Sequence, residues 1–218
     1  MATEPWRVED SLDLYGINRW GRDYFSANRK GNIVIRSSTS AQTYSDVKEI
    51  VDTLRADGIQ TPMLLRFPQL IGDRIQRQYQ AFEKARRDYG YKGRLRAVFP
   101  MKVNQEKEVI DDILEFGERH DYGLEVGSKP ELLASIAIKK NPRAMLICNG
   151  FKDYEFIELA CYASLFRKNV IIVIDKLDEV DKIIQAIKAT GAKPMIGIRM
   201  KLYTRGGGKW AESGGERA

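Results

Sequence analysis

A lysine at the end of an apolar run is the residue of this sequence best suited to covalent chemistry. Residues 99–105 read FPMKVNQ, and Lys102 stands between an expected strand and an expected helix. The apolar neighbours that would shield its ε-amine from water are Val98, Phe99, Met101 and Val103. Burial lowers the pKa of an ammonium group, and only the neutral amine can attack a carbonyl to form an imine. Lys102 is therefore a candidate nucleophile, although most lysines at strand ends are only solvated surface groups.

Four more polar residues lie at or near the ends of later apolar runs. Glu125 stands in GLEVGSK, where it either pairs with Lys102 or is a surface acid of an alternating strand. Asn149 and Asp175 follow the next two runs, and we interpret them as turn residues. Arg199 ends the fifth run, and an arginine in a buried strand needs an anion or another acceptor as its partner. Arg199 is therefore a further site candidate.

The elements that must position these residues alternate regularly between strands and helices. Expected strands begin about every 25 residues, a spacing typical of βα units around a parallel sheet. A helical pattern follows each of the first four runs, and one of these helices opens with Ser128 and Glu131, the spacing of a capping box. The expected strands cover residues 95–99, 122–126, 145–148, 170–174 and 195–200.

Two α/β architectures fit this cycle. A doubly wound sheet usually carries a glycine-rich phosphate loop after its first strand, and none is found there. We therefore favour a (β/α)8 barrel, in which the carboxyl ends of the strands form the mouth of the active site. Because five barrel strands are visible, the predicted fold is a partial barrel with the five candidate residues at one end.

An extension is expected before the barrel. Residues 1–60 are assigned to it, with a short strand at 32–36 and an amphipathic helix that carries Val47, Ile50, Val51 and Leu54. Residues 61–218 are assigned to the barrel, and they begin with an expected strand at 63–67 and a long polar helix that reaches about residue 89.

The composition argues against several classes of protein. The net charge of +6 comes from 36 basic and 30 acidic residues mixed along the chain, without the basic face and stacking aromatics of a nucleic-acid binder. One histidine and two cysteines without a CxxC motif do not make a zinc site. The first residues lack the apolar core of a signal peptide, and no apolar run is long enough to cross a bilayer. We expect a cytoplasmic protein without nucleic-acid or membrane partners.

Several long strings match one family in order. They include LYGINRWGRDYF, PMLLRFPQLIGDRI, FPMKVNQ, GLEVGSKPELL, ICNGFKDYEFIELA and GGGKWAESGGE, and together they resemble the biosynthetic arginine decarboxylases over nearly the whole chain. The family usually has Tyr, Ile, Ala and Ser where this sequence has Phe99, Met101, Val126 and Gly207. These substitutions are mild and leave the lysine unchanged.

The resemblance implies a fold, a cofactor and a reaction. It implies a (β/α)8 barrel that binds pyridoxal 5′-phosphate (PLP) and a C-terminal β-domain. Lys102 matches the lysine that holds PLP, Glu125 an acidic position near it, and Arg199 an arginine that lines the cofactor site. The implied reaction converts L-arginine to agmatine and carbon dioxide, the entry to putrescine synthesis, and Mg²⁺ is often associated with the family. A homo-oligomer is expected for the full-length protein.

Other readings remain open at this point. They are a related decarboxylase that acts on ornithine or diaminopimelate, a non-catalytic PLP-binding barrel, and a partial chain that only contributes to an assembly. The family continues beyond Ala218 with three more barrel strands and further cofactor contacts, so we expect the 218 residues alone to be inactive. His120 is expected at the opposite end of the barrel from Lys102.

Overall fold

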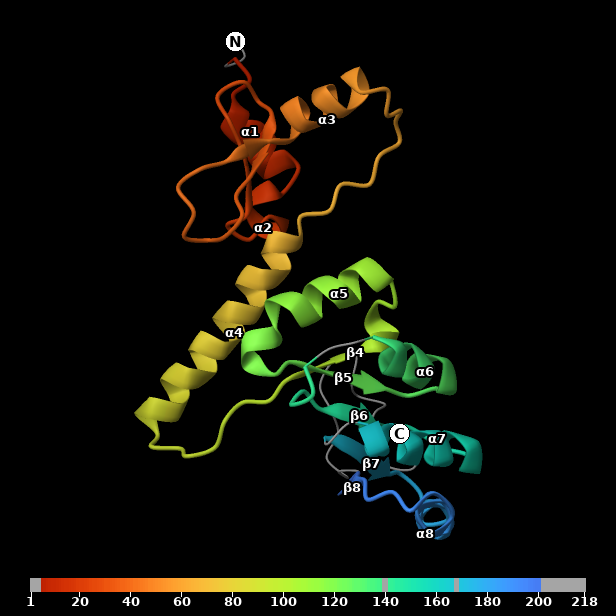
Figure 1. The fold of residues 1–218 in the computed structure, drawn as a ribbon. Coiled ribbons are helices and arrows are strands. Elements are labelled where there is room, and N and C mark those ends of the chain that lie inside the picture. The colour runs from red at the N-terminus through yellow and green to blue at the C-terminus, as the bar shows by residue number, and fades with distance from the viewer. Residues whose placement is uncertain (1–4, 139–140, 167–168, 201–218) are drawn as a thin grey trace. The chain divides into compact units, whose positions relative to one another are not determined.

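The computed structural model describes residues 5–138, 141–166 and 169–200. Contacts divide the chain into two compact units, Met1–Gly93 and Arg94–Ala218 (Figure 1). The boundary expected between residues 60 and 61 lies inside the first unit, and a hydrogen bond of 2.6 Å from Tyr24 to Asp73 joins the two sides of that boundary. The assignment of residues 61–93 to the barrel stays a prediction.

The first unit combines short helices with a small antiparallel sheet. The strand expected at 32–36 is confirmed as β2, the central strand, and the amphipathic helix is confirmed as α3. The strand expected at 63–67 is wrong. Those residues form no helix and pair with no described strand, and an apolar run forms a strand only when a neighbour takes its backbone hydrogen bonds. The elements are α1 (Val8–Leu14), α2 (Ile17–Trp20), β1 (Phe25–Ala27), β2 (Ile33–Ile35), β3 (Ser45–Asp46), α3 (Val47–Ala56) and α4 (Pro68–Asp88).

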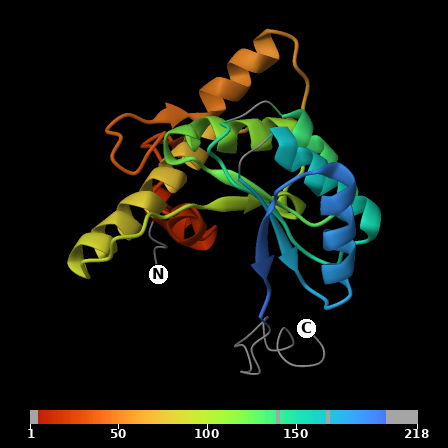
Figure 2. The same cartoon turned by 60° about the horizontal axis from the view of Figure 1, so that its bottom comes forward.

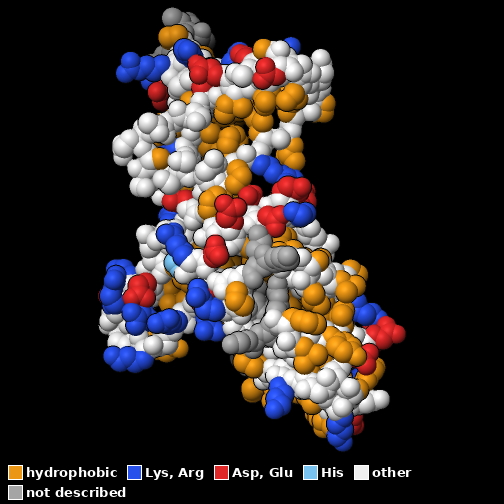
Figure 3. Space-filling model, viewed as in Figure 1, with side chains coloured by type: hydrophobic (Ala, Val, Ile, Leu, Met, Phe, Trp, Pro, Cys, Tyr) orange, Lys and Arg blue, Asp and Glu red, His pale blue; other side chains and the backbone are white. Residues whose placement is uncertain are grey.

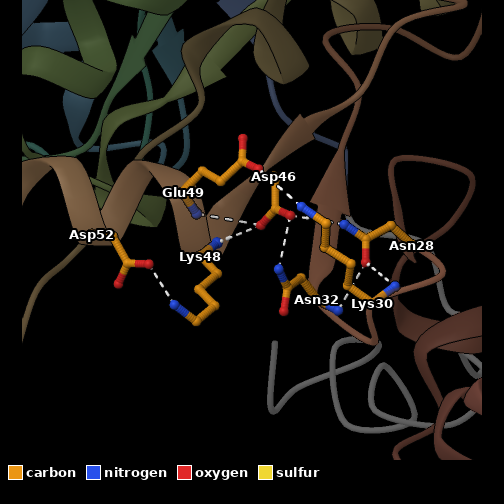
Figure 4. Close-up of polar contacts among 7 residues, drawn as sticks. All are labelled: Asn28, Lys30, Asn32, Asp46, Lys48, Glu49 and Asp52. Atoms are coloured by element: carbon orange, nitrogen blue, oxygen red, sulfur yellow. Dashed lines mark hydrogen bonds and ion pairs between the residues drawn. The ribbon is translucent and has the colours of Figure 1, made fainter.

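Asp46 joins the hairpin of this sheet to the start of α3 (Figure 4). One carboxylate oxygen accepts hydrogen bonds from the side chains of Asn28, at 2.8 Å, and Asn32, at 2.9 Å. The other accepts from the backbone amides of Lys48, at 2.9 Å, and Glu49, at 3.3 Å, so Asp46 caps the helix. The hydrogen bond from Asn32, helped by the other three donors against partial desolvation, lowers the pKa of Asp46 below its usual value.

The second unit confirms five parallel strands in chain order. Adjacent strands pair in the order β4-β5-β6-β7-β8. The first strand begins later than expected and reaches Pro100, while the last ends at Ile198 instead of residue 200. The strands are β4 (Val98–Pro100), β5 (Gly123–Val126), β6 (Leu146–Cys148), β7 (Val170–Ile174) and β8 (Met195–Ile198). The helices after the first four strands are α5 (Lys107–Phe116), α6 (Lys129–Ala137), α7 (Tyr154–Phe166) and α8 (Glu179–Thr190).

Helices cover one face of this sheet. Alternate strand residues form a single buried cluster with side chains of α5, α6, α7 and α8, which lie along one side of the sheet in Figures 1 and 2. Each fully buried aliphatic side chain contributes roughly 1.5–3 kcal/mol to folding. Residues of the opposite parity, such as Glu125, Ile147 and Ile171, are only half-buried. The fully buried strand residues are Val126, Leu146, Cys148, Val170 and Ile172.

The last described strand is apolar yet exposed. Among the described strands β8 pairs only with β7, and the exposed fractions of Ile196 and Ile198 are 46% and 76%. Hydrophobic side chains also gather on the surface around α6 and α7 (Figure 3), where Leu165 and Phe166 are exposed. This unit therefore presents apolar area at one sheet edge and on its helical layer.

We expect Gly123→Ala to destabilise the second unit by about 1–3 kcal/mol, the usual cost of overpacking. A Cβ at this position of β5 would overlap the backbone carbonyl oxygen of Met145, and backbone is harder to displace than a side-chain end. Gly197→Ala is the matched control, because its Cβ would meet only methyl groups of Val173 and Ile171, at 3.3 and 3.4 Å. The measurement is the urea unfolding midpoint of the parent, Gly123→Ala and Gly197→Ala. Equal midpoints for the two variants would contradict this view of the sheet.

We expect acid to weaken the first unit through Asp46. A carboxyl whose pKa is lower in the folded state than in the unfolded state stabilises the fold at every pH above the unfolded-state pKa, here 3.8. This contribution disappears as the pH falls through the folded-state pKa. Asp46→Ala should lower the unfolding midpoint at pH 7 and reduce its dependence on acid. Asp52→Ala, which removes only an exposed ion pair with Lys48 in α3, is the control. The unfolding midpoint is measured from pH 7 to pH 2. If it falls equally steeply with acid in Asp46→Ala and in the parent, this role is excluded.

Candidate active site

Lys102 lies at the carboxyl end of β4, inside a short 3-10 turn over Met101–Val103. Met101 is 3% exposed and anchors this turn in the hydrophobic core. The side-chain oxygen of Asn104 accepts a hydrogen bond of 2.9 Å from the backbone amide of Glu106, which shapes the chain before α5. Gln105 donates a hydrogen bond of 3.1 Å to Glu131 of α6. The FPMKVNQ segment thus fixes the lysine by contacts on both sides of it.

The apolar shielding expected around Lys102 is wrong. Lys102 is exposed, and its neighbour Val103 is 67% exposed, because the 3-10 turn directs Met101 alone into the core. No ion pair between Lys102 and Glu125 is found within the described residues. The amine of Lys102 is therefore accessible to a small molecule from solution.

Glu125 lies on the sheet face that the helices leave open. It is the third residue of β5, in register with Pro100 of β4 and Ile147 of β6, and it is half-buried. Its neighbours Leu124 and Val126 point to the other face and belong to the core. Glu125 is thus a strand residue that carries its carboxylate on the face opposite the helices.

Asn149 and Asp175 directly follow β6 and β7. Asn149 precedes Gly150, whose φ of +79° is a turn conformation that favours glycine, so the turn interpretation holds locally. However, the side-chain oxygen Oδ1 of Asn149 and the Oδ1 of Asp175 are both buried without a hydrogen-bond donor among the described residues. Buried acceptors are normally hydrogen-bonded. These two oxygens can therefore accept hydrogen bonds at the same edge of the sheet as Lys102.

Arg199 is the partner of Asp175. Its Nη1 lies 3.4 and 3.5 Å from the two carboxylate oxygens, and the Asp175 side chain is 1% exposed. Both distances are long for a charge-assisted hydrogen bond, so the contact is mainly ionic. Arg199 does have an acceptor, Asp175, but the buried setting from which we predicted one is wrong, since Arg199 lies just beyond β8 and its side chain is 48% exposed.

The structure also contains a buried ion pair that the sequence did not indicate. The Nζ of Lys152, in the loop after β6, lies 3.0 Å from Oε2 of Glu179, the first residue of α8, and the two side chains are 0% and 1% exposed. Burial tends to raise the pKa of Glu179, but backbone amides of Asp175 and Lys152 and the Lys152 ammonium outweigh it and lower that pKa. In sequence, Glu179 looks like any acid in the first turn of a helix. Only its spacing of four residues from Asp175 was a possible signal.

A hollow of about 520 Å³ lies over the loops at this end of the sheet. It is lined by Gly127 and Lys129 of the loop and helix after β5, Lys152 after β6, and Glu179 and Lys182 after β7. Lys129 is paired with Asp153 and Glu155, and Lys182 with Asp178, each at 2.6 or 2.7 Å. The pairs of Lys129 therefore join segments that follow two different strands, whereas Lys182 and Asp178 pair locally at the start of α8.

The other reactive residue types do not join this edge. Cys148 and Cys161 are free and buried, as expected, and burial raises the pKa of Cys148 to about 12. His120 ends a 3-10 turn just before β5, which puts it at the amino ends of the strands, opposite to Lys102, as predicted. No group of three or more acidic, histidine or cysteine residues that could hold a metal ion is found in the described part of the chain. The glycine-rich tail with Gly207 lies outside the described residues.

Comparison with known proteins agrees with this geometry. Residues 72–218 match the family model described as "Pyridoxal-dependent decarboxylase, pyridoxal binding domain". The chain is 44% identical over 213 residues to the biosynthetic arginine decarboxylase of Prochlorococcus marinus (strain MIT 9215), and this match covers 98% of the chain and 33% of the relative. It is 42% identical over 216 residues to that of Parasynechococcus marenigrum (strain WH8102), with 99% and 34% covered.

A solved structure has the same fold. The crystal structure of the biosynthetic arginine decarboxylase SpeA from Campylobacter jejuni matches with a TM-score of 0.79 and 39% identity, over 87% of this chain and 32% of that one. The chain thus spans about a third of the length of the relatives that it matches. Its five parallel strands, with helices after the first four, are those of a barrel of the (β/α)8 type, as expected. Because the family model covers all five strands and Lys102, the chain belongs to the pyridoxal-dependent decarboxylases, in their pyridoxal-binding domain.

Proposed function

We propose that the protein to which this chain belongs decarboxylates L-arginine to agmatine and carbon dioxide with PLP, as the first step toward putrescine. The observation that carries the proposal is an accessible lysine at a parallel strand end in a chain that is collinear with arginine decarboxylases over 98% of its length. The substrate is inferred from that of the arginine decarboxylases that the chain resembles, which are much longer than this chain.

The residues of the sheet edge fit an aldehyde cofactor. Lys102 is exposed and, within the described residues, forms no ion pair with Glu125. That carboxylate therefore does not neutralise the amine that would join the cofactor. The cation of Arg199 and the open acceptors of Asn149 and Asp175 lie at the same edge. A cofactor that bears a phosphate would find there a cation for its anionic group and acceptors for its donor groups.

In the proposed mechanism each residue has a limited task. PLP, when bound, accepts the electron pair that the departing carboxylate leaves behind. Lys102 would hold the cofactor through Nζ, and the same amine, when free, would carry a proton to the α-carbon of the substrate. Glu125 would provide a carboxylate on the sheet face that the helices leave open. Arg199, held by Asp175, would provide a positive charge for an anionic group.

The proposal also covers location, assembly and metal requirement. A cytoplasmic location is supported by the two free cysteines, which are typical of reducing compartments. In the described part of the chain no helix is long and apolar enough to cross a membrane. Association into a homo-oligomer and a requirement for Mg²⁺ are proposed from the family resemblance alone.

We expect PLP to be bound covalently by Lys102 in the full-length protein. Reduction with borohydride should fix the cofactor on a single peptide, because reduction makes an imine permanent and we expect only the amine of Lys102 to form one. Lys107, an exposed lysine of α5 five residues away, is the matched control. Peptide mapping of the parent, Lys102→Ala and Lys107→Ala should show label in the first and third proteins only. Label that persists in Lys102→Ala would rule out the assignment.

We expect the full-length protein to release labelled carbon dioxide from carboxyl-labelled L-arginine, and Lys102→Ala to lose at least about a hundredfold in kcat, since it removes both the anchor and the proton carrier. The 218 residues alone should release none with added PLP. Ornithine and diaminopimelate, tested in parallel, distinguish the related decarboxylases. Binding of PLP without release from any of the three substrates would favour a non-catalytic barrel instead.

A further inference from the structure

The buried pair of Lys152 and Glu179 lies between the two loops that carry Asn149 and Asp175. The proposed mechanism does not use it. Glu179 Oε1 accepts a hydrogen bond of 2.9 Å from the backbone amide of Lys152, and its Oε2 accepts one of 2.9 Å from the backbone amide of Asp175. The Lys152 ammonium contacts Oε2 at 3.0 Å and also donates to the carbonyl oxygen of Gly150.

Three of these four contacts fix backbone next to the candidate site, and the fourth joins the two side chains to each other. Gly150 directly follows Asn149, and the amide of Asp175 belongs to the residue that pairs with Arg199. One carboxylate therefore holds the ends of two adjacent strands and the start of α8 in a single arrangement. We call the set formed by Lys152 and Glu179 the loop clamp.

Stability alone does not account for the loop clamp. Two buried charges lose their hydration, and replacement of such pairs by neutral side chains of similar shape is often neutral or even stabilising. A buried ion pair does, however, impose one geometry on the groups that surround it. At this clamp those groups are the backbone segments that aim Asn149 and Asp175 at the edge where Lys102 lies.

We propose that Lys152 and Glu179 are positioning residues, which hold Asp175 and Asn149 in the geometry required for chemistry at Lys102. The proposal rests on the proposed function for its activity measurement only. Neither clamp residue needs to touch substrate or cofactor. Loss of the clamp should therefore disturb the site by letting the 149–152 and 175–179 segments move.

The decisive variant is the double substitution Lys152→Met with Glu179→Gln in the full-length protein loaded with PLP. It removes both charges, keeps similar shapes, and leaves a side-chain carbonyl that can accept one of the two amide hydrogen bonds. The matched control is Lys182→Met with Asp178→Asn. In that pair Lys182 Nζ lies 2.6 Å from Asp178 Oδ2, and both residues line the same hollow. Their side chains, however, are 34% and 62% exposed.

We expect the clamp variant to fold with a melting temperature within about 5 °C of the parent, because neutral replacement of a buried pair costs little stability. Amide hydrogen exchange should become faster in peptides that span 149–152 and 175–179, and the visible circular dichroism of bound PLP should change. A misplaced site typically loses about ten- to a hundredfold in rate, so kcat should fall by that factor while KM for arginine changes less than about threefold. The control should match the parent in every measurement.

Two results would overturn the proposal. A double variant that fails to fold would show that the pair serves stability, and one with unchanged exchange, dichroism and kcat would show that it positions nothing. If the parent itself does not turn over arginine, the proposed function fails, but the exchange and dichroism measurements still test the loop clamp.

Discussion

Parallel pairing of consecutive strands is the constraint on which the candidate site depends. Each strand of the second unit pairs with the next in the chain, so every carboxyl end falls on the same edge of the sheet. Residues separated by more than twenty positions in sequence, such as Lys102, Asn149 and Asp175, therefore meet at one edge without any contact that is specific to them. The helical layer makes this pairing stable, because it buries alternate residues of β5, β6 and β7.

The same pairing explains the different characters of the two sheet faces. The face toward the helices is closed and apolar, with Val126, Cys148 and Ile172 fully buried. The other face carries Glu125 among half-buried aliphatic residues. A polar group costs little on this second face and much on the first. Glu125 is the strand neighbour of Val126, and this position alone places its carboxylate on the face opposite the helices.

The charged residues at this edge form an accessible set and a buried set. Arg199 and Lys102 are accessible, whereas Lys152 and Glu179 are buried and engage mostly backbone. Asp175 connects the two sets, since its amide binds Glu179 and its side chain contacts Arg199. An accessible cation held by a buried acid keeps its direction while it remains available to a ligand. This arrangement suits recognition of an anionic group at a strand end.

The sequence by itself determined the strand and helix order, the parallel sheet and the end at which the candidates gather, because these follow from periodicity along the chain, whereas the choice of Lys102 rested on the family resemblance. It failed for residues 63–67, where strand formation depends on a partner, and for the shielding of Lys102, which depends on the direction of a 3-10 turn. The pairing of Asp175 with Arg199 and that of Lys152 with Glu179 were decided by tertiary structure alone. Each joins residues that are 24 or more positions apart, and only the packing of adjacent strand ends brings such side chains within reach.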